Sequence, residues 1–161
     1  MNGEPMRVEL KPGDKAPDFS LPTAGGGRVR LRDLKGKAVV LYFYPKDDTS
    51  GCTQEALRFT EKAADFARLG ATVIGVSRDT VKSHDKFRAK HSLEVILAFD
   101  EDGAVCGLYG VWTEKSMYGR QYMGIERSTF LIDQKGKIVN TWRKVKVTGH
   151  IDDVLASTSK V

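Results

Sequence analysis

The stretch AVVLYFYPKDDTSGCTQEALRF, residues Ala38 to Phe59, decides the fold. Its first part, Ala38 to Tyr44, is a continuous apolar run rich in β-branched and aromatic residues, which is typical of a strand buried on both faces. A turn containing a proline follows, and the apolar positions then change to helical spacing. One of the two cysteines of the chain, Cys52, stands where this helix is predicted to begin. This pattern indicates an α/β fold that carries a cysteine at the carboxyl end of a strand.

The same alternation of strand and helix continues along the chain. Apolar residues keep helical spacing from Thr53 to Leu69, and Gly70 is predicted to end that helix. ATVIGVS (Ala71 to Ser77) predicts a second buried strand, Val81 to His91 a second helix, and VILAF (Val95 to Phe99) a third strand. This β-α-β-α-β order implies right-handed crossovers and a parallel sheet core.

Two hairpins are predicted to flank this core. FSL and RVRL alternate around a glycine cluster before the first buried strand, which predicts an N-terminal hairpin. RSTFLID and IVNTWRKV, separated by Lys135 to Lys137, predict a second hairpin, and IDDVLAS predicts a final short helix. WRKVKV, Trp142 to Val147, alternates like a strand with one exposed face. We therefore predict a thioredoxin-like α/β fold with a mixed central sheet, flanking helices and an added N-terminal β-hairpin. It would form one domain over 1–161, with its core at about 11–155.

Composition and charge exclude several classes of protein. With 161 residues, 40% apolar and 29% charged, the chain is that of an ordinary globular protein. The net charge of +5 is mild and its basic residues are spread, so no nucleic-acid partner is expected. The N-terminus lacks the apolar region of a secretory signal, and no window is long enough to span a membrane. We expect a cytoplasmic protein with no membrane partner, in which two distant cysteines serve chemistry, metal binding or plain burial rather than a structural disulfide.

The surroundings of Cys52 favour a nucleophile. It lies in the first turn of the predicted helix, with Ser50 or Gly51 expected near the N-cap. A helix N-terminus offers unpaired N–H groups and a positive dipole end, which favour thiolate over thiol. Thr49 stands three residues earlier, and Pro45 fixes the turn and shields the site from one side. The following residues lack the second cysteine of a C-x-x-C pair, which disfavours disulfide exchange of the thioredoxin kind.

Several segments together resemble a known family. Pro45-x-x-x-Thr49-x-x-Cys52 is similar to the P-x-x-x-T-x-x-C signature of peroxiredoxins. With GDKAPDFSLP before it and YGVW and ERSTFLID after it, the chain resembles the bacterioferritin-comigratory (PrxQ) branch of that family. The resemblance implies a thiol peroxidase that reduces hydrogen peroxide and organic hydroperoxides without a metal or a bound cofactor.

The resemblance also implies roles for individual residues. Cys52 would be the peroxidatic cysteine, Thr49 would hydrogen-bond the peroxide, and Pro45 would wall the pocket. Arg127, in ERSTFLID, matches the family's active-site arginine, and its charge would stabilise the thiolate and a peroxide oxygen. The alternative for Arg127 is a surface ion pair with Glu126.

Other polar residues receive ordinary interpretations. His84, His91 and His150 are scattered without ligand spacing, which favours surface or helix-end histidines over metal ligands. Asp47 and Asp48 are adjacent in a turn and are expected to be solvated rather than to act in acid–base catalysis.

The sequence leaves two sources for the thiol that completes the catalytic cycle, a second cysteine of the chain and an external reductant. Many relatives carry a resolving cysteine five positions after the first or on the following helix, where this chain has Leu57 and Arg88. Cys106, on a predicted short helix after the third strand, is a possible resolving cysteine, and its alternative role is a small apolar core residue. We favour a one-cysteine cycle in a monomer, with thioredoxin or glutaredoxin with glutathione as the reductant. The remaining alternatives are a thiol–disulfide oxidoreductase and a thioredoxin-fold binding module.

Overall fold

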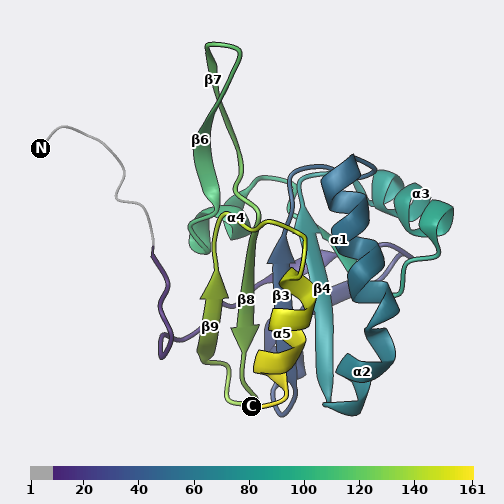
Figure 1. The fold of residues 1–161 in the computed structure, drawn as a ribbon, viewed down its shortest axis with the longest axis vertical. Coiled ribbons are helices and arrows are strands. Elements are labelled where there is room, and N and C mark those ends of the chain that lie inside the picture. Colours follow the sequence, from purple (N-terminus) through teal and green to yellow (C-terminus); the bar gives the residue numbers. More distant parts are fainter. Residues whose placement is uncertain (1–8) are drawn as a thin grey trace, which may run out of the picture.

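The computed structural model describes residues 9–161, and a five-stranded mixed sheet forms its centre. In spatial order the strands are β5 (Ile96–Phe99), β4 (Ala71–Ser77), β3 (Ala38–Phe43), β8 (Ser128–Ile132) and β9 (Ile138–Trp142). The first three run parallel to one another, whereas β8 and β9 run antiparallel to their neighbours. The mixed sheet confirms the predicted thioredoxin-like arrangement (Figure 1).

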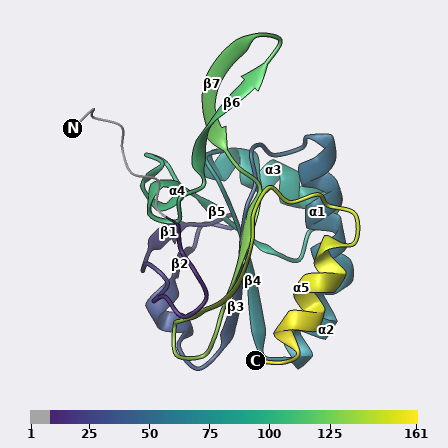
Figure 2. The ribbon, with the colours of Figure 1, turned by 60° about the vertical axis from the view of Figure 1, so that its left-hand side comes forward.

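Helices and a small hairpin cover the two faces of this sheet. On one side lie α1 (Ser50–Glu61), α2 (Ala63–Arg68) and α5 (His150–Thr158), as Figure 2 shows. The other side carries β1 (Ser20–Pro22) and β2 (Arg28–Arg30), the 3-10 helix η1 (Leu31–Leu34) and α4 (Ala104–Leu108). Helix α3 (Val81–His91) packs into the same core cluster as α1 through its Phe87. The strands β1 and β2 are the N-terminal hairpin that the sequence predicted.

The central strand β3 divides the core into two clusters. All its residues are buried, and successive side chains point to opposite faces of the sheet. Val39 and Leu41 therefore pack with β8 and α4, whereas Val40 and Tyr42 pack under α1. The ring of Tyr42 stacks on Phe59 of α1 with centroids 4.6 Å apart. Packing on both faces is the reason for the unbroken apolar run of this segment.

A glycine inside β4 makes room for the Tyr42 ring. Gly75 pairs with Tyr42 across the parallel ladder. A Cβ on Gly75 would lie 2.6 Å from Cζ of that tyrosine, far inside van der Waals contact. Glycine normally weakens a strand, so its presence here follows from the close approach of the ring.

Two predicted elements end earlier than the sequence suggested. The single helix expected from Thr53 to Leu69 is broken at Lys62, whose φ of −99° and ψ of 8° leave helical geometry between α1 and α2. The prediction that a strand continues through WRKVKV was wrong, because β9 ends at Trp142. Lys144 there has a φ of 49°, in the left-handed region that no strand tolerates. The N–H of Val145 instead donates to the carbonyl of Arg127 at 3.0 Å.

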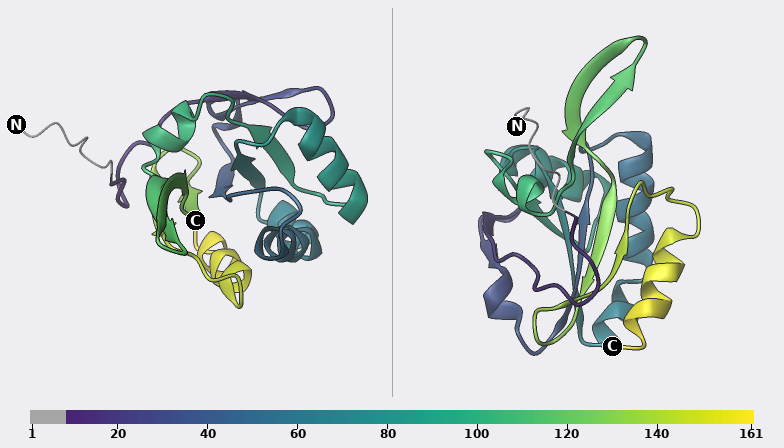
Figure 3. Two further views of the ribbon diagram at one scale, coloured as in Figure 1. Left: turned by 90° about the horizontal axis from the view of Figure 1, so that it is seen from above. Right: turned by 90° about the vertical axis from the view of Figure 1, so that its left-hand side faces the viewer.

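A long hairpin that sequence analysis did not assign rises beyond the sheet. It consists of β6 (Trp112–Met117) and β7 (Arg120–Ile125), joined by Tyr118 and Gly119, both with positive φ. Figures 1 and 3 show it projecting from the end of the molecule at which α1 begins. We call this hairpin, residues 112–125, the arm. The sequence does not indicate this hairpin, because Tyr118-Gly119 is not the typical signal of a two-residue turn, as Asn-Gly would be.

The described helices are also informative about membranes. Among residues 9–161, no helix combines the length and the apolar character needed to cross a bilayer.

Candidate active site

Cys52 lies in the first turn of α1, immediately after the loop that follows β3. The N-cap is Thr49, one residue before the Ser50 or Gly51 that the sequence suggested, and the N–H of Thr53 closes the first turn on the Thr49 carbonyl at 2.8 Å. The cysteine is 1% exposed, so only a small reactant or a partner that enters the pocket reaches its sulfur. The sulfur thus lies at the N-terminus of α1, where the first N–H groups of a helix lack intrahelical partners.

Arg127 connects Cys52 to a buried acid. Its Nη2 donates to Cys52 Sγ at 3.3 Å, and its Nη1 donates to Glu55 Oε1 at 2.7 Å. The pKa of Arg127 is raised, since burial opposes the charged form but the charges of Glu55 and Cys52 outweigh it. The guanidinium is therefore a fixed cation beside the sulfur. Its observed ion-pair partner is Glu55, whereas the sequence offered only Glu126 as an acidic neighbour.

Glu55 is a site residue that sequence analysis missed. It lies three residues after Cys52 in α1 and has no exposed surface. Burial raises its pKa to about 7, although the Arg127 charge acts in the opposite direction. Among the described residues, its Oε2 and the buried hydroxyl of Tyr42 have no hydrogen-bond partner. The spacing of three residues from Cys52 was the available signal, because residues so spaced share a helix face.

Gly51 gives Arg127 the space to reach the sulfur. A Cβ at this position would lie 3.1 Å from Arg127 Nη2, tighter than an ordinary contact. Any larger residue at position 51 would push the guanidinium away from Cys52. This contact supplies a physical reason for the glycine that precedes the cysteine.

Thr49 and Pro45 belong to the loop between β3 and α1. The Thr49 hydroxyl is exposed and donates to the carbonyl of Lys46 at 2.8 Å. Because that bond uses its only proton, the hydroxyl oxygen can only accept a hydrogen bond from a molecule bound beside it. Pro45 is half-buried directly after Tyr44 at the start of the loop. The structure thus places both predicted residues on the segment that leads into Cys52.

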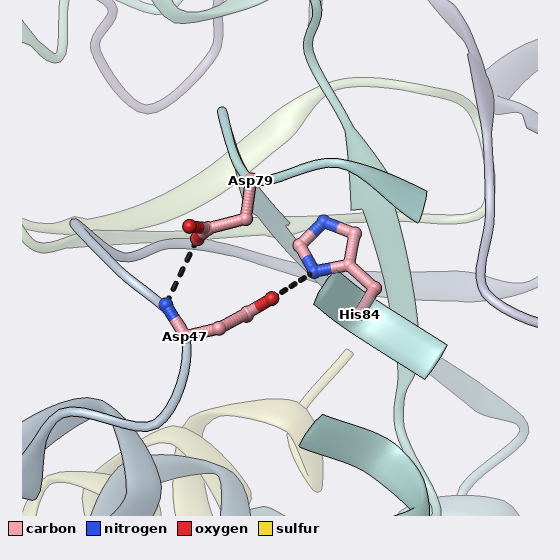
Figure 4. Close-up of side chains that lie close together, drawn as sticks. All are labelled: Asp47, Asp79 and His84. Atoms are coloured by element: carbon pink, nitrogen blue, oxygen red, sulfur yellow. Dashed lines mark hydrogen bonds and ion pairs between the residues drawn. The ribbon is translucent and has the colours of Figure 1, made fainter. Parts of the chain in front are cut away.

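Asp47 anchors this loop to the rest of the protein, and its predicted solvent exposure was wrong. It is 8% exposed because its carboxylate accepts three hydrogen bonds. The Tyr44 hydroxyl donates at 2.5 Å, the Ser83 hydroxyl at 2.8 Å, and His84 Nδ1 lies 2.7 Å away. The backbone N–H of Asp47 donates to Asp79 Oδ2 at 2.8 Å (Figure 4). The loop that carries Thr49 is therefore held from β4 and α3.

His84 is a buried member of this network, not the surface histidine that the sequence favoured. Its Nε2 lies 3.0 Å from the Ala98 carbonyl, and its Nδ1 faces the Asp47 carboxylate. Both ring nitrogens of His84 therefore have an oxygen partner inside the protein. The other two histidines lie at helix ends, His91 closing α3 and His150 opening α5, although His150 is only 5% exposed.

The same cluster is the group of possible metal ligands found among residues 9–161. One donor atom each from Asp47, Asp79 and His84 lies within 4.8 Å of the others. These atoms are already used inside the protein, since Asp79 Oδ2 also accepts from the Ser77 hydroxyl at 2.6 Å. Asp47 and His84 are likewise occupied by hydrogen-bond partners of the protein, so the three residues serve as a structural network.

Asp48, the second aspartate of the loop, is exposed as expected but is also tied to α3. Its carboxylate contacts Lys90 Nζ at 2.7 Å and His91 Nε2 at 2.8 Å. The hydrogen bond from Lys90 is the main cause that lowers its pKa. Its φ of 58° is unusual for a residue other than glycine. These contacts hold the turn in that conformation.

Cys106 lies on the other side of the central sheet from Cys52. It is buried in α4 and belongs to the cluster around Val39 and Leu41, whereas Cys52 belongs to the cluster under α1. The pKa of the Cys106 thiol is raised, first by burial and then by its hydrogen bond to Asp100. A protonated thiol across the sheet is poorly placed to attack a sulfur at Cys52.

The fold and the site together define a thiol-dependent enzyme on a thioredoxin-like scaffold. Residues 12–141 match the model of the AhpC/TSA family. The chain is 49% identical to the putative peroxiredoxin bcp of Coxiella burnetii, over 93% of this chain and 98% of that protein. It is 48% identical to the peroxiredoxin Bcp of Bacillus subtilis, over 93% and 94%.

A solved structure agrees with these relatives. The bacterioferritin comigratory protein of Xanthomonas campestris, studied for its alkyl peroxide reduction activity, superposes with a TM-score of 0.86 at 47% identity. The match covers 94% of this chain and 96% of that one. The chain therefore belongs to the AhpC/TSA family, and its relatives there are peroxiredoxins of the Bcp or PrxQ branch. The resemblance drawn from the sequence is confirmed.

Proposed function

We propose that this peroxiredoxin reduces hydroperoxides with Cys52 as its nucleophile and returns to the reduced state through an external thiol. The observation that carries the proposal is the Arg127 guanidinium, which donates to Cys52 Sγ and is held from its other side by buried Glu55. A cysteine kept only for packing would not need a charged donor withdrawn from water beside it. This contact therefore disfavours a binding module in which Cys52 merely fills the core.

The geometry suggests how the first step proceeds. The Cys52 thiolate attacks one peroxide oxygen, an S–O bond forms as the O–O bond breaks, and the leaving alkoxide takes a proton from solvent. Arg127 stabilises the sulfur before attack and the oxygen on which charge develops. Thr49 accepts a hydrogen bond from the peroxide hydroxyl, and Pro45 bounds the pocket on the loop side. The products are an alcohol, or water from hydrogen peroxide, and a sulfenic acid on Cys52.

The substrates are proposed to be hydrogen peroxide and organic hydroperoxides. The alkyl peroxide reduction activity of the Xanthomonas campestris relative supports the organic class for this chain. The residues proposed to act on the peroxide contact only its oxygen atoms, so nothing in this step requires a particular alkyl group. A cytoplasmic location and a monomeric state remain predictions from the sequence.

A one-cysteine cycle is proposed because no second thiol is placed to resolve Cys52. Leu57 and Arg88 occupy the positions where many relatives carry a resolving cysteine, and Cys106 lies across the sheet. A disulfide needs the two Cα atoms within roughly 7 Å, so a bridge to Cys106 would require the sheet or its helices to open. The same separation disfavours a thiol–disulfide oxidoreductase that uses both cysteines. Thioredoxin, or glutaredoxin with glutathione, is the proposed source of the thiol.

Two measurements test the proposal. Peroxide consumption driven by dithiothreitol should fall to background in Cys52→Ser and persist in Cys106→Ser, which is the matched control. Retained activity in the Cys52 variant would refute the assignment of the nucleophile.

Mass spectrometry after one equivalent of peroxide then tests the cycle. We expect a dimedone adduct on Cys52 and no internal disulfide. A bridge between Cys52 and Cys106 that forms at the rate of turnover would replace the one-cysteine cycle with a two-cysteine cycle.

A further inference from the structure

The arm concentrates exposed apolar side chains next to the active site. Among the residues that the structure describes, eight large hydrophobic side chains are exposed, and four of them lie between Met117 and Met123. Tyr118 at the tip is 97% exposed, and Met117 is 55% exposed. Methionine and tyrosine are enriched at protein interfaces and are an unusual choice for an isolated projection into water. The arm is therefore the strongest interaction surface of the described chain.

The register of the arm divides it into two sides. Directly paired residues of an antiparallel hairpin point to the same side, and successive pairs alternate. One side carries the pairs Lys115 with Tyr122 and Met117 with Arg120, and we call it the inner side. The outer side carries the pairs Glu114 with Met123 and Ser116 with Gln121.

The inner side faces the active site. The pKa of Lys115 is lowered, first by its partial burial and then by the nearby Arg127 charge, while Cys52 acts in the opposite direction. The base of the arm is also fixed beside the site by the backbone, since the N–H of Glu126, the residue before Arg127, donates to the Val111 carbonyl at 2.7 Å. Tyr122 shares this side, because a Cβ at Gly124 would meet Lys115 Cδ at 3.2 Å and Tyr122 Cε2 at 3.4 Å. The arm then leads through Glu126 directly into Arg127.

The inner side combines apolar contact area with positive charge. Its two exposed apolar residues are Met117 and Tyr122, and its charged residues are Lys115 and Arg120. The acidic residue of the arm strands, Glu114, lies on the outer side. Such a surface complements a partner that presents acidic groups around an apolar patch.

The chemistry of the cycle specifies what must arrive there. The sulfenic acid on Cys52 is buried and, under the proposed one-cysteine cycle, receives its thiol from outside. The incoming thiol forms an S–S bond with Cys52, and the sulfenic oxygen leaves as water with the thiol proton. A second thiol of the same reductant then forms the reductant's own disulfide and releases Cys52 as a thiol. A protein that brings its cysteine to the buried sulfur of Cys52 would therefore come close to the arm.

We propose that the inner side of the arm, through Tyr122 and through Met117 and Arg120 next to the tip, docks the dithiol protein that reduces Cys52. The partner presents an acidic surface with an apolar patch beside its reactive cysteine. This inference rests on the proposed function, because it assigns a partner to the second half of that cycle. Lys115 lies too close to Arg127 to serve as a test position, so the test uses the other three residues.

The experiment compares two reductants on the same variants. Peroxide turnover is measured with thioredoxin, thioredoxin reductase and NADPH, and separately with dithiothreitol, for the wild type and a Met117→Ser/Tyr122→Ser double variant. We expect the kcat/KM for thioredoxin to fall about tenfold or more, as for truncated interface anchors, and the dithiothreitol rate to stay within about twofold. Met123→Ser, on the outer side, is the matched control and should leave both rates unchanged. Arg120→Glu should lower the thioredoxin rate and reduce its dependence on salt concentration.

Other outcomes overturn the proposal. Equal losses with both reductants would place the inner side in the peroxide step or in folding, and no loss with thioredoxin would leave the arm without this role. If neither thioredoxin nor glutaredoxin with glutathione drives the wild type while dithiothreitol does, the partner is not a dithiol protein. A wild type that consumes no peroxide even with dithiothreitol would instead contradict the proposed function itself.

Discussion

The buried carboxyl group of Glu55 makes folding stability depend on pH in a way that one substitution removes. Its pKa is about 7 in the folded protein, against an ordinary value of 4.5, and burial is the main cause. Between these values the folded state holds a proton that the unfolded state has released, so stability falls as the pH rises from 4.5 through 7. At about 1.4 kcal/mol for each unit, the loss amounts to about 3 kcal/mol. Glu55→Gln keeps the shape of the side chain and removes this titration.

The measurement is urea unfolding of the reduced wild type and Glu55→Gln at several values between pH 4.5 and pH 8. As the pH rises over this range, the free energy of unfolding of the variant should increase by about 3 kcal/mol relative to that of the wild type. Glu61→Gln is the matched control, because Glu61 is an exposed acid of the same helix, paired with Arg58. A constant difference between Glu55→Gln and the wild type would show that burial does not hold the proton on Glu55. The Arg127 charge would then outweigh burial in setting the pKa of Glu55.

Three further predictions address neighbouring parts of the structure. Arg127→Ala should slow peroxide reduction on the order of 10²-fold, and alkylation of Cys52 should require higher pH, since a preorganised donor to the thiolate is lost; an unchanged rate and alkylation profile would return Arg127 to a surface role. Burial lowers the pKa of His150 from 6.5 to about 4. The protein is therefore more stable above pH 6.5 by up to about 3 kcal/mol, and this stability is lost as the pH falls through 4. His150→Asn should flatten that acid limb in urea unfolding, and an unaltered limb would contradict it. Gly75→Ala should cost about 1–3 kcal/mol of unfolding free energy because its Cβ would lie 2.6 Å from the Tyr42 ring. Gly107→Ala, with no atom within 4 Å of its Cβ, is the control, and equal effects of the two substitutions would rule out the proposed clash.

The sequence predicted the sheet because its strands are buried on both faces. The apolar runs that became β3, β4 and β5 contain few polar residues, and such runs are typical of a parallel core covered on both faces. The arm was missed for the opposite reason. Its strands are exposed on both sides, so their sequence lacks the alternation that burial imposes, and its turn uses Tyr118 with a positive φ.

Part of the candidate site could likewise be predicted from the sequence, and part could not. The position of Cys52 at the start of α1 followed from local sequence, and Arg127 followed from the family resemblance. Glu55 and the network around Asp47 were not found, because their roles depend on residues distant in the chain. Arg127 lies 72 positions after Glu55, and His84 lies 37 positions after Asp47. Periodicity predicts which face of an element a residue occupies, but not which charged side chain the neighbouring element places opposite it.

The network around Asp47 also bears on why this chain would depend on an outside thiol. A resolving cysteine on α3 would have to bring its Cα within roughly 7 Å of that of Cys52. In this chain α3 is fastened at one end by the buried pair of His84 with Asp47 and at the other by Lys90 and His91 on Asp48. Breaking a buried pair of this kind costs on the order of 3–5 kcal/mol, which would oppose any unwinding of α3. Because α3 carries no cysteine, the proposed cycle does not require it to unwind. The same contacts also hold the loop that carries Thr49. The contacts that hold α3 and the absence of a thiol on it are therefore both consistent with the proposed cycle, in which an external reductant brings its thiol to Cys52.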